Sequence, residues 1–200
     1  WLLLCFYFWQ KIILFTLVFE LSLPIFVFLV AALWEFPAAL FKKRLMLKAK
    51  KKREKFKDLI VIGITGSYGK SSTKEYVYFL LSFKYGEEAV LKTKGNINTD
   101  IGIANTILHH LGKNHKFFVC EMGAYRKGDI KTCCLIAQPK IGIVTGVNEQ
   151  HLSTFGSMEN LLSAEGGKEL IESLPPDGMA FFNAKNKYCL DLYNKTNIKK

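Results

Sequence analysis

The most informative stretch of this sequence is residues 59–72, which read LIVIGITGSYGKSS. Residues 59–65 form a short, continuous, β-branched apolar run, which is typical of a buried strand. A glycine-rich turn follows, and residues 71–84 have the pattern of a helix. Glycines at a strand-to-helix turn allow backbone N–H groups to face phosphate oxygens, so the stretch predicts a phosphate-binding loop.

Two side chains of this loop suit a nucleoside triphosphate. Lys70 can reach the β- and γ-phosphates, and the Ser71 hydroxyl can ligate Mg²⁺. The usual pattern has another glycine where this chain has Ile64, so the alternative is a tight turn followed by an exposed lysine. We expect the nucleotide to contact the whole loop, which comprises Thr65, Gly66, Ser67, Tyr68, Gly69, Lys70, Ser71 and Ser72.

The rest of residues 58–200 alternates predicted strands with predicted helices. Strands are expected at 89–93, 117–123, 141–147 and 179–183, and helices at 101–111, in a short segment through 136, and at 157–174. This alternation predicts an α/β fold in which a parallel sheet carries helices on both faces. Ligands of such sheets bind at the carboxyl ends of the strands.

Three more candidate sites lie at predicted strand ends. Glu121 ends the 117–123 strand, where a carboxylate can hold Mg²⁺, although an exposed loop acid is the alternative. His151 follows the 141–147 strand and is either a metal-site residue or an ordinary loop histidine. Asn98 and Thr99 precede a helix and suit either a polar ligand or, more simply, a helix cap.

Five segments in this order resemble the ATPase domain of the Mur ligases: GITGSYGKSSTKE, TKGNINTDIGIA, FFVCEMGAYRKGDI, IGIVTGVNEQHLSTFGS and AEGGKELIESLPPDG. The resemblance covers about residues 58–190. It accounts for the shifted glycine, because the loop of that family reads G-x-T-G-x-x-G-K-[ST]. It implies a P-loop NTPase-like central domain that uses ATP and Mg²⁺.

The resemblance also implies an activity in peptidoglycan precursor synthesis. ATP would phosphorylate the carboxylate of a UDP-linked muramoyl peptide, and the amine of D-alanyl-D-alanine would attack the acyl phosphate. Lys70, Glu121 and His151 would be the catalytic residues. Ser71 and Glu121 would hold the first Mg²⁺, and His151 would lie beside the second.

The same resemblance assigns substrate-facing positions and exposes two departures from the family. Asn98 and Thr99 match a segment that faces substrate and phosphates. The family completes its second metal site with a lysine in an A-K-x-E-L type sequence, where this chain offers either Glu165 or, in a shifted register, Lys168. Residues 183–186 read NAKN where acidic residues are expected.

Residues 1–41 are apolar apart from Lys11, Glu20 and Glu35. A membrane-spanning helix needs about 20 apolar residues, which residues 21–41 nearly supply alone. We therefore expect a transmembrane helix or a hairpin that turns near Glu20 to Pro24. A buried core helix is the alternative. A signal peptide fits poorly, because the basic residues follow the apolar run.

Residues 42–57 form a basic juxtamembrane linker with ten Lys and Arg against Glu54, a net charge of +9, whereas residues 58–200 carry +3. A basic cluster beside a membrane span marks the cytoplasmic side and attracts anionic lipid. We therefore expect lipid contacts along residues 1–57, with a monomeric ATPase domain in the cytoplasm. Nucleic-acid binding is not expected, because the basic stretch lacks interleaved aromatic residues.

Composition excludes several classes of protein. Half of the chain is apolar, which excludes a disordered tail, and the five cysteines form no C-x-x-C pair, which argues against a zinc site or a disulfide scaffold. Because the sequence begins at Trp1 and ends in a lysine-rich run, we expect a fragment that does not ligate alone, with substrate domains outside it. The alternatives are a Mur-type ligase for a folate or amino-acid polymer, a membrane-anchored P-loop kinase or regulator, and a non-catalytic scaffold.

Overall fold

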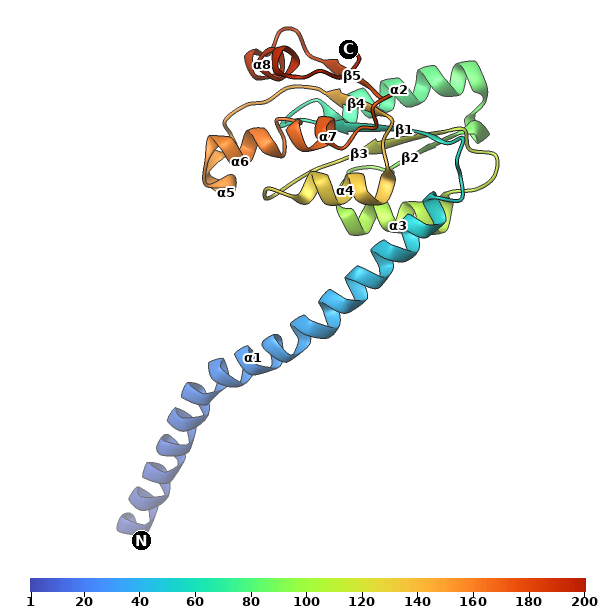
Figure 1. Cartoon of the computed structure of the whole chain (residues 1–200). Coiled ribbons are helices and arrows are strands. Elements are labelled where there is room, and N and C mark those ends of the chain that lie inside the picture. Colours follow the sequence, from blue (N-terminus) through green and yellow to red (C-terminus); the bar gives the residue numbers. More distant parts are fainter. The chain divides into compact units, whose positions relative to one another are not determined.

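The computed structural model describes the backbone of residues 1–200 and every side chain apart from that of Leu3. Contacts between residues divide the chain into two units, Trp1–Arg44 and Leu45–Lys200. The first unit consists of most of helix α1 (Leu2–Arg53), and the second contains the sheet and the remaining helices (Figure 1).

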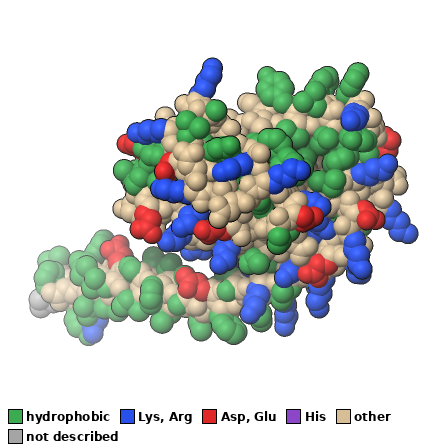
Figure 2. All heavy atoms as spheres, turned by 45° about the horizontal axis from the view of Figure 1, so that its top comes forward, with side chains coloured by type: hydrophobic (Ala, Val, Ile, Leu, Met, Phe, Trp, Pro, Cys, Tyr) green, Lys and Arg blue, Asp and Glu red, His purple; other side chains and the backbone are tan. Residues whose placement is uncertain are grey.

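Helix α1 is a single unbroken helix of 52 residues that contains Pro24 and Pro37. Its side chains are mostly hydrophobic and exposed (Figure 2). It is long and apolar enough, by length and composition, to cross a membrane. Of the two expected arrangements, the structure therefore has the single helix and not the hairpin near Glu20 to Pro24. A proline inside a helix removes one backbone hydrogen bond and bends the helix without having to reverse the chain.

In the described part of the chain, five strands form one parallel sheet in the order β2-β3-β1-β4-β5. The strands are β1 (Ile60–Thr65), β2 (Val90–Lys92), β3 (Phe117–Glu121), β4 (Ile141–Val144) and β5 (Met179–Phe182). They match the predicted strands, although each is shorter than predicted by one to three residues. Strand β1 lies between β3 and β4, so the loops that follow these three strands meet at one edge of the sheet.

Helices cover both faces of this sheet, as predicted. Helix α2 (Lys70–Tyr85) packs on one face against Ile62, Ile64 and Val119. Helices α3 (Asp100–His110) and α4 (Asp129–Ala137) lie on the opposite face, where the larger core forms around Val61, Phe118 and Cys120 (Figure 1). A short 3₁₀ helix, η1 (Glu87–Ala89), leads into β2.

The predicted helix at 157–174 is interrupted. Helix α6 (Met158–Ser163) ends before the turn, and α7 (Lys168–Glu172) begins after it. Gly167 precedes α7 with a φ of +88°, a left-handed conformation that glycine adopts readily. Three elements had no sequence prediction: η1, α5 (Leu152–Phe155) and α8 (Lys187–Lys195). Cys189 of α8 is buried in the larger core.

The end of α1, from Leu45 onward, belongs to the globular unit, and two of its basic side chains bind backbone groups there. Arg53 is buried and donates hydrogen bonds from its guanidinium to the carbonyl oxygens of Ala137, Phe56 and Leu59 at 2.9–3.1 Å. Lys52 donates to the carbonyl oxygen of Leu108 at 2.9 Å. Both side chains thus bind carbonyl groups near the C-termini of helices, where the helix dipole favours positive charge.

Candidate functional site

The phosphate-binding loop predicted from the sequence lies between β1 and α2. Gly69 precedes α2 with a φ of +79°, so the chain turns sharply and Lys70 begins the helix. The loop is held in place by Thr145, whose hydroxyl donates to the Tyr68 carbonyl oxygen at 2.6 Å, and by the Ser67 N–H, which donates to the Gly146 carbonyl oxygen at 2.7 Å. The N-terminus of a helix that follows such a turn attracts anions.

Lys70 lies over its own loop. Its amine donates to the Gly66 carbonyl oxygen at 2.5 Å, and the Ser67 carbonyl oxygen lies 3.4 Å away. Thr65 at the end of β1 is fully buried, and its hydroxyl has no hydrogen-bond partner among the described residues. The loop therefore presents an ammonium group and a helix N-terminus together, which is the arrangement a nucleotide phosphate requires.

Glu121 is the centre of the site. It ends β3 with 1% of its surface exposed. Its Oε1 accepts hydrogen bonds from the Ser71 hydroxyl at 3.1 Å and from the Asn98 amide at 3.3 Å. Its Oε2 lies 3.1 Å from the Lys74 amine. The phosphate loop, the segment before α3 and the end of β3 therefore meet at one carboxylate.

The two substrate candidates before α3 have different positions. Asn98 reaches Glu121, as described, whereas the Thr99 hydroxyl accepts a hydrogen bond from the Gly102 N–H at 3.2 Å and caps α3. Thr99 is therefore a helix cap, which was the simpler of the two expectations from the sequence. Thr93 also contributes, because its buried hydroxyl accepts the N–H of Glu121 at 3.1 Å and fixes the strand end.

A second polar pair joins the loop after β4 to the turn between α6 and α7. Nδ1 of His151 lies 3.1 and 3.2 Å from the two carboxylate oxygens of Glu165. The side chain of Glu165 is 4% exposed and that of His151 is 48% exposed. The carboxylate is thus held inside the protein while part of the imidazole faces solvent.

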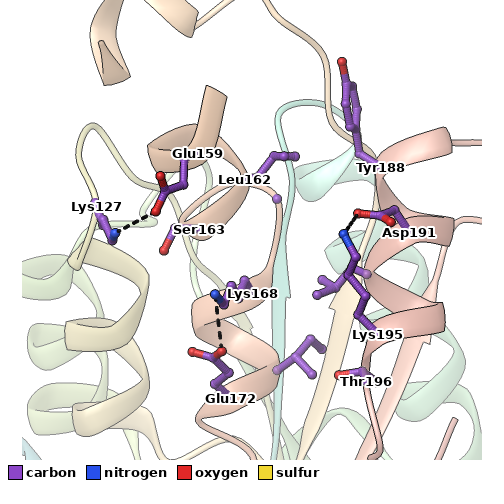
Figure 3. Close-up of a pocket in the computed structure, with 13 residues that line it drawn as sticks. Lys127, Glu159, Leu162, Ser163, Lys168, Glu172, Tyr188, Asp191, Lys195 and Thr196 are labelled. Carbon is purple, nitrogen blue, oxygen red and sulfur yellow. Dashed lines mark hydrogen bonds and ion pairs between the residues drawn. The ribbon is translucent and has the colours of Figure 1, made fainter. Parts of the chain in front are cut away.

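Lys168 lies at a different place. Its amine is 3.8 Å from the Glu172 carboxylate, and the residue lines a cavity of about 590 Å³ between α6, α7 and α8 (Figure 3). Two further ion pairs line the cavity, Lys127–Glu159 and Lys195–Asp191. Of the two residues proposed from the sequence to complete the second metal site, the structure brings Glu165, and not Lys168, into contact with His151.

The donors at Glu121 suit Mg²⁺. This ion prefers oxygen ligands and is commonly held by one or two carboxylates together with substrate phosphates. Glu121 and Ser71 offer a carboxylate and a hydroxyl oxygen beside the phosphate loop. The described residues contain no group of three or more His, Cys, Asp or Glu side chains able to hold a metal by themselves. A cation here would therefore depend on phosphate oxygens.

Besides Thr145, sequence reasoning missed three residues around the site. Lys74 stands three positions after Ser71, which places both on one face of α2, and this spacing is a signal that could have identified it. Asn183 and Asn186, found where acidic residues were expected, donate to the carbonyl oxygens of Thr145 and Val147 at 2.8 Å. These asparagines tie the end of β5 to the loop after β4.

The sequence of this chain is similar to those of known proteins. The model of the Mur ligase middle domain matches residues 64–200. This chain belongs to the Mur ligase family. Among its curated relatives, UDP-N-acetylmuramoyl-tripeptide–D-alanyl-D-alanine ligase from Synechocystis sp. is 37% identical over 131 residues, which are 66% of this chain and 28% of that protein. The ligase of that name from Escherichia coli is 36% identical over 126 residues, 63% of this chain and 26% of that protein.

Solved structures agree with this assignment. MurF from Acinetobacter baumannii has a TM-score of 0.67 at 29% identity, and the match covers 76% of this chain and 32% of that one. MurF ligase from Thermotoga maritima in complex with ADP has a TM-score of 0.63 at 36% identity, covering 70% of this chain and 31% of that one. The chain thus spans under a third of the length of these relatives and has the fold of the Mur ligase central domain.

Proposed function

We propose that this chain is the ATP-handling part of a ligase of peptidoglycan precursor synthesis, which joins D-alanyl-D-alanine to a UDP-linked muramoyl tripeptide. The observation that carries the proposal is the buried Glu121 carboxylate, hydrogen-bonded to Ser71 of the phosphate loop. It stands in a chain 33–37% identical to ligases that bear this activity in their names. ATP would activate the muramoyl carboxylate as an acyl phosphate, which the dipeptide amine attacks.

Each group at the site has a specific task in this reaction. The backbone N–H groups of residues 65–72 bind the β- and γ-phosphates, and Lys70 leaves its own loop carbonyls to bind the phosphoryl group being transferred. Ser71 and Glu121 would hold Mg²⁺, which supplies positive charge against the developing charge on the phosphates. Asn98 orients the Glu121 carboxylate, and Thr99 fixes the start of α3 beside the substrate.

We further propose that Glu165 provides the carboxylate of the second cation site, with His151 beside it. Support comes from the contact of 3.1 Å between them and from the burial of Glu165. Lys168, which pairs with Glu172, has no part in this assignment. Substitution of Glu165 by glutamine should lower turnover and raise the Mg²⁺ concentration that turnover requires, whereas substitution of Lys168 by methionine should change neither.

We also propose that the apolar part of α1, within residues 1–41, anchors the protein in the cytoplasmic membrane as a monomer with residues 58–200 in the cytoplasm. Support comes from the length and apolar composition of α1. The exposed basic side chains that follow also favour the proposal, namely Lys43, Arg44, Lys48, Lys51, Lys55 and Lys57. Anionic lipid is the partner that such a cluster attracts.

The test uses the complete reading frame that contains these 200 residues. The purified protein is given Mg-ATP and UDP-N-acetylmuramoyl-tripeptide, with and without D-alanyl-D-alanine, and phosphate release and product mass are followed. Phosphate release that needs both substrates, with a product heavier by the dipeptide less water, supports the proposal. Phosphate release without this product would contradict the assigned substrates and leave another Mur-type ligase or a kinase as the function.

A further inference from the structure

Lys74 is a buried charged residue that has no part in the proposed ligase reaction. It lies in the second turn of α2 with 1% of its surface exposed. Its amine is 3.1 Å from Oε2 of Glu121 and donates to the carbonyl oxygen of Gly95 at 2.5 Å. Removing two charges from water is costly, so such a pair persists only where both groups are well satisfied.

The contacts divide the Glu121 carboxylate into two halves with different surroundings. Oε2 is held by Lys74, whereas Oε1 accepts from Ser71 and Asn98 on the side of the phosphate loop. Only Oε1 is therefore presented next to the hydroxyl of the loop. Through Gly95, the same amine also fixes the segment that carries Asn98.

The charged side chains around the Glu121 carboxylate favour the binding of an anion at this site over the binding of a cation. Lys74 balances Glu121, and Lys70 adds a positive charge over the loop. The remaining acid near Lys74 is Glu75, whose Oε1 lies 3.7 Å from the amine, and Glu75 is itself paired with Lys92. This pairing holds the pKa of Glu75 below its ordinary value. These five groups together carry a net charge of +1.

We propose that Lys74 is the internal counter-cation of Glu121: it positions the carboxylate and suppresses binding of a divalent cation until nucleotide phosphates are present. The proposal rests on the proposed nucleotide site and adds an order to it, in which the cation enters together with the nucleotide. Lys74 is thus a positioning residue that acts through Glu121 and touches no substrate.

The test measures Mn²⁺ binding by electron paramagnetic resonance, without nucleotide, on the full 200-residue chain in lipid nanodiscs. The wild-type chain should bind Mn²⁺ weakly. The Lys74→Met variant leaves a buried, unpaired carboxylate and should bind Mn²⁺ at least about tenfold more tightly, since one positive charge a few ångströms from a divalent cation is removed. Lys74→Arg keeps the charge and should bind as weakly as the wild type.

Two further variants locate the effect. Lys74→Met combined with Glu121→Gln should lose the gained Mn²⁺ binding, because both charges are then absent. Lys84→Met is the matched control, since it removes an exposed lysine of the same helix whose amine lies over the ring of Tyr85. It should leave Mn²⁺ binding unchanged.

Thermal unfolding followed by circular dichroism provides the second readout. Lys74→Met should be destabilised, and Mn²⁺ alone should restore much of its melting temperature, even if the variant is unfolded without the ion. A purely structural lysine would give the same loss of stability with no recovery by Mn²⁺. That outcome overturns the proposal. Two results of the Mn²⁺ titration also overturn it: the Lys74→Met variant binds Mn²⁺ no more tightly than the wild type, or the tighter binding persists when Glu121→Gln is added.

A separate measurement, the binding of a fluorescent ATP analogue, tests the proposed nucleotide site independently of the role of Lys74. A fluorescent ATP analogue that does not bind the wild-type chain would contradict the nucleotide site. It would leave the charge pairing of Lys74 and Glu121 to be judged by the Mn²⁺ data alone.

Discussion

Replacement of Glu169 by glutamine should destabilise the globular unit substantially. Glu169 is buried, and its Oε1 accepts from the Gly128 N–H at 2.8 Å and the Ser163 hydroxyl at 3.1 Å. Its Oε2 accepts from the Lys131 N–H at 3.0 Å. The carboxylate therefore caps the N-terminus of α4 from a neighbouring helix and joins α4, α6 and α7.

The size of the effect follows from these contacts. Glutamine keeps the shape but turns one acceptor into a donor, so at least one backbone N–H loses its partner. A hydrogen bond to a charged group contributes about 1.5–3 kcal/mol, and the charge at the helix N-terminus contributes about 0.3–1 kcal/mol more. We expect a loss of about 2–4 kcal/mol, which lowers the melting temperature of a domain of this size by about 4–16 °C.

Thermal unfolding of the full chain in detergent, followed by circular dichroism, measures this loss. Glu172→Gln is the control, because its side chain is 65% exposed and its ion pair with Lys168 is a surface pair that contributes about 0–1 kcal/mol. Equal melting temperatures for the two variants would refute the reasoning. A larger loss for Glu169→Gln supports it.

Three other predictions follow from the structure. Deletion of residues 1–44 should leave a folded protein that moves from the membrane to the soluble fraction on centrifugation, whereas deletion of residues 1–57 removes buried Arg53 and should lower the melting temperature by several degrees. Burial raises the pKa of Cys134 to about 12 and raises the pKa of Cys120 well above its ordinary value, whereas unfolding exposes thiols that ionise at about pH 8.5. Stability should therefore fall as the pH rises above about 8.5, by about 1.4 kcal/mol per pH unit for each thiol, and melting curves that do not change between about pH 8 and pH 10 would contradict this. Asn98→Ala removes one hydrogen bond to Glu121 and should lower the rate of phosphate release by the complete ligase about tenfold, with little change in melting temperature. A fall in the rate that is accompanied by a clear fall in melting temperature would indicate a structural role only.

The sheet could be predicted because its signals are local. The apolar run of β1 and the glycine-rich turn after it are together typical of a buried strand that leads into a helix. The interrupted helix at 157–174 was less predictable, since two adjacent glycines weaken a helix without fixing where it ends. Helix α8 follows the NAKN segment, where acidic residues were expected. Its sequence is mostly polar, so burial of Cys189 could not be predicted from it.

Parts of the site depend on distances that no local pattern gives. Glu121 and Ser71 could be placed at strand and helix ends, but their hydrogen bond joins residues 50 positions apart. Lys74 has the composition of a surface helix residue, and only the packing of α2 on the sheet makes it a buried partner of Glu121. The pairing of Arg53 with the end of α4 likewise could not be predicted from a basic run that is typical of a solvated linker.

The most direct test of the nucleotide site is calorimetric titration of the full chain, in nanodiscs, with a non-hydrolysable ATP analogue. We expect the wild type to bind the analogue in the presence of Mg²⁺, with affinity at least about tenfold weaker in a chelator, and Lys70→Ala to lose binding by about a hundredfold. Lys185→Ala, an exposed lysine beyond β5, serves as the control and should bind normally. Equal binding by the wild type and Lys70→Ala, or no binding by the wild type, would contradict the assignment of this loop to ATP.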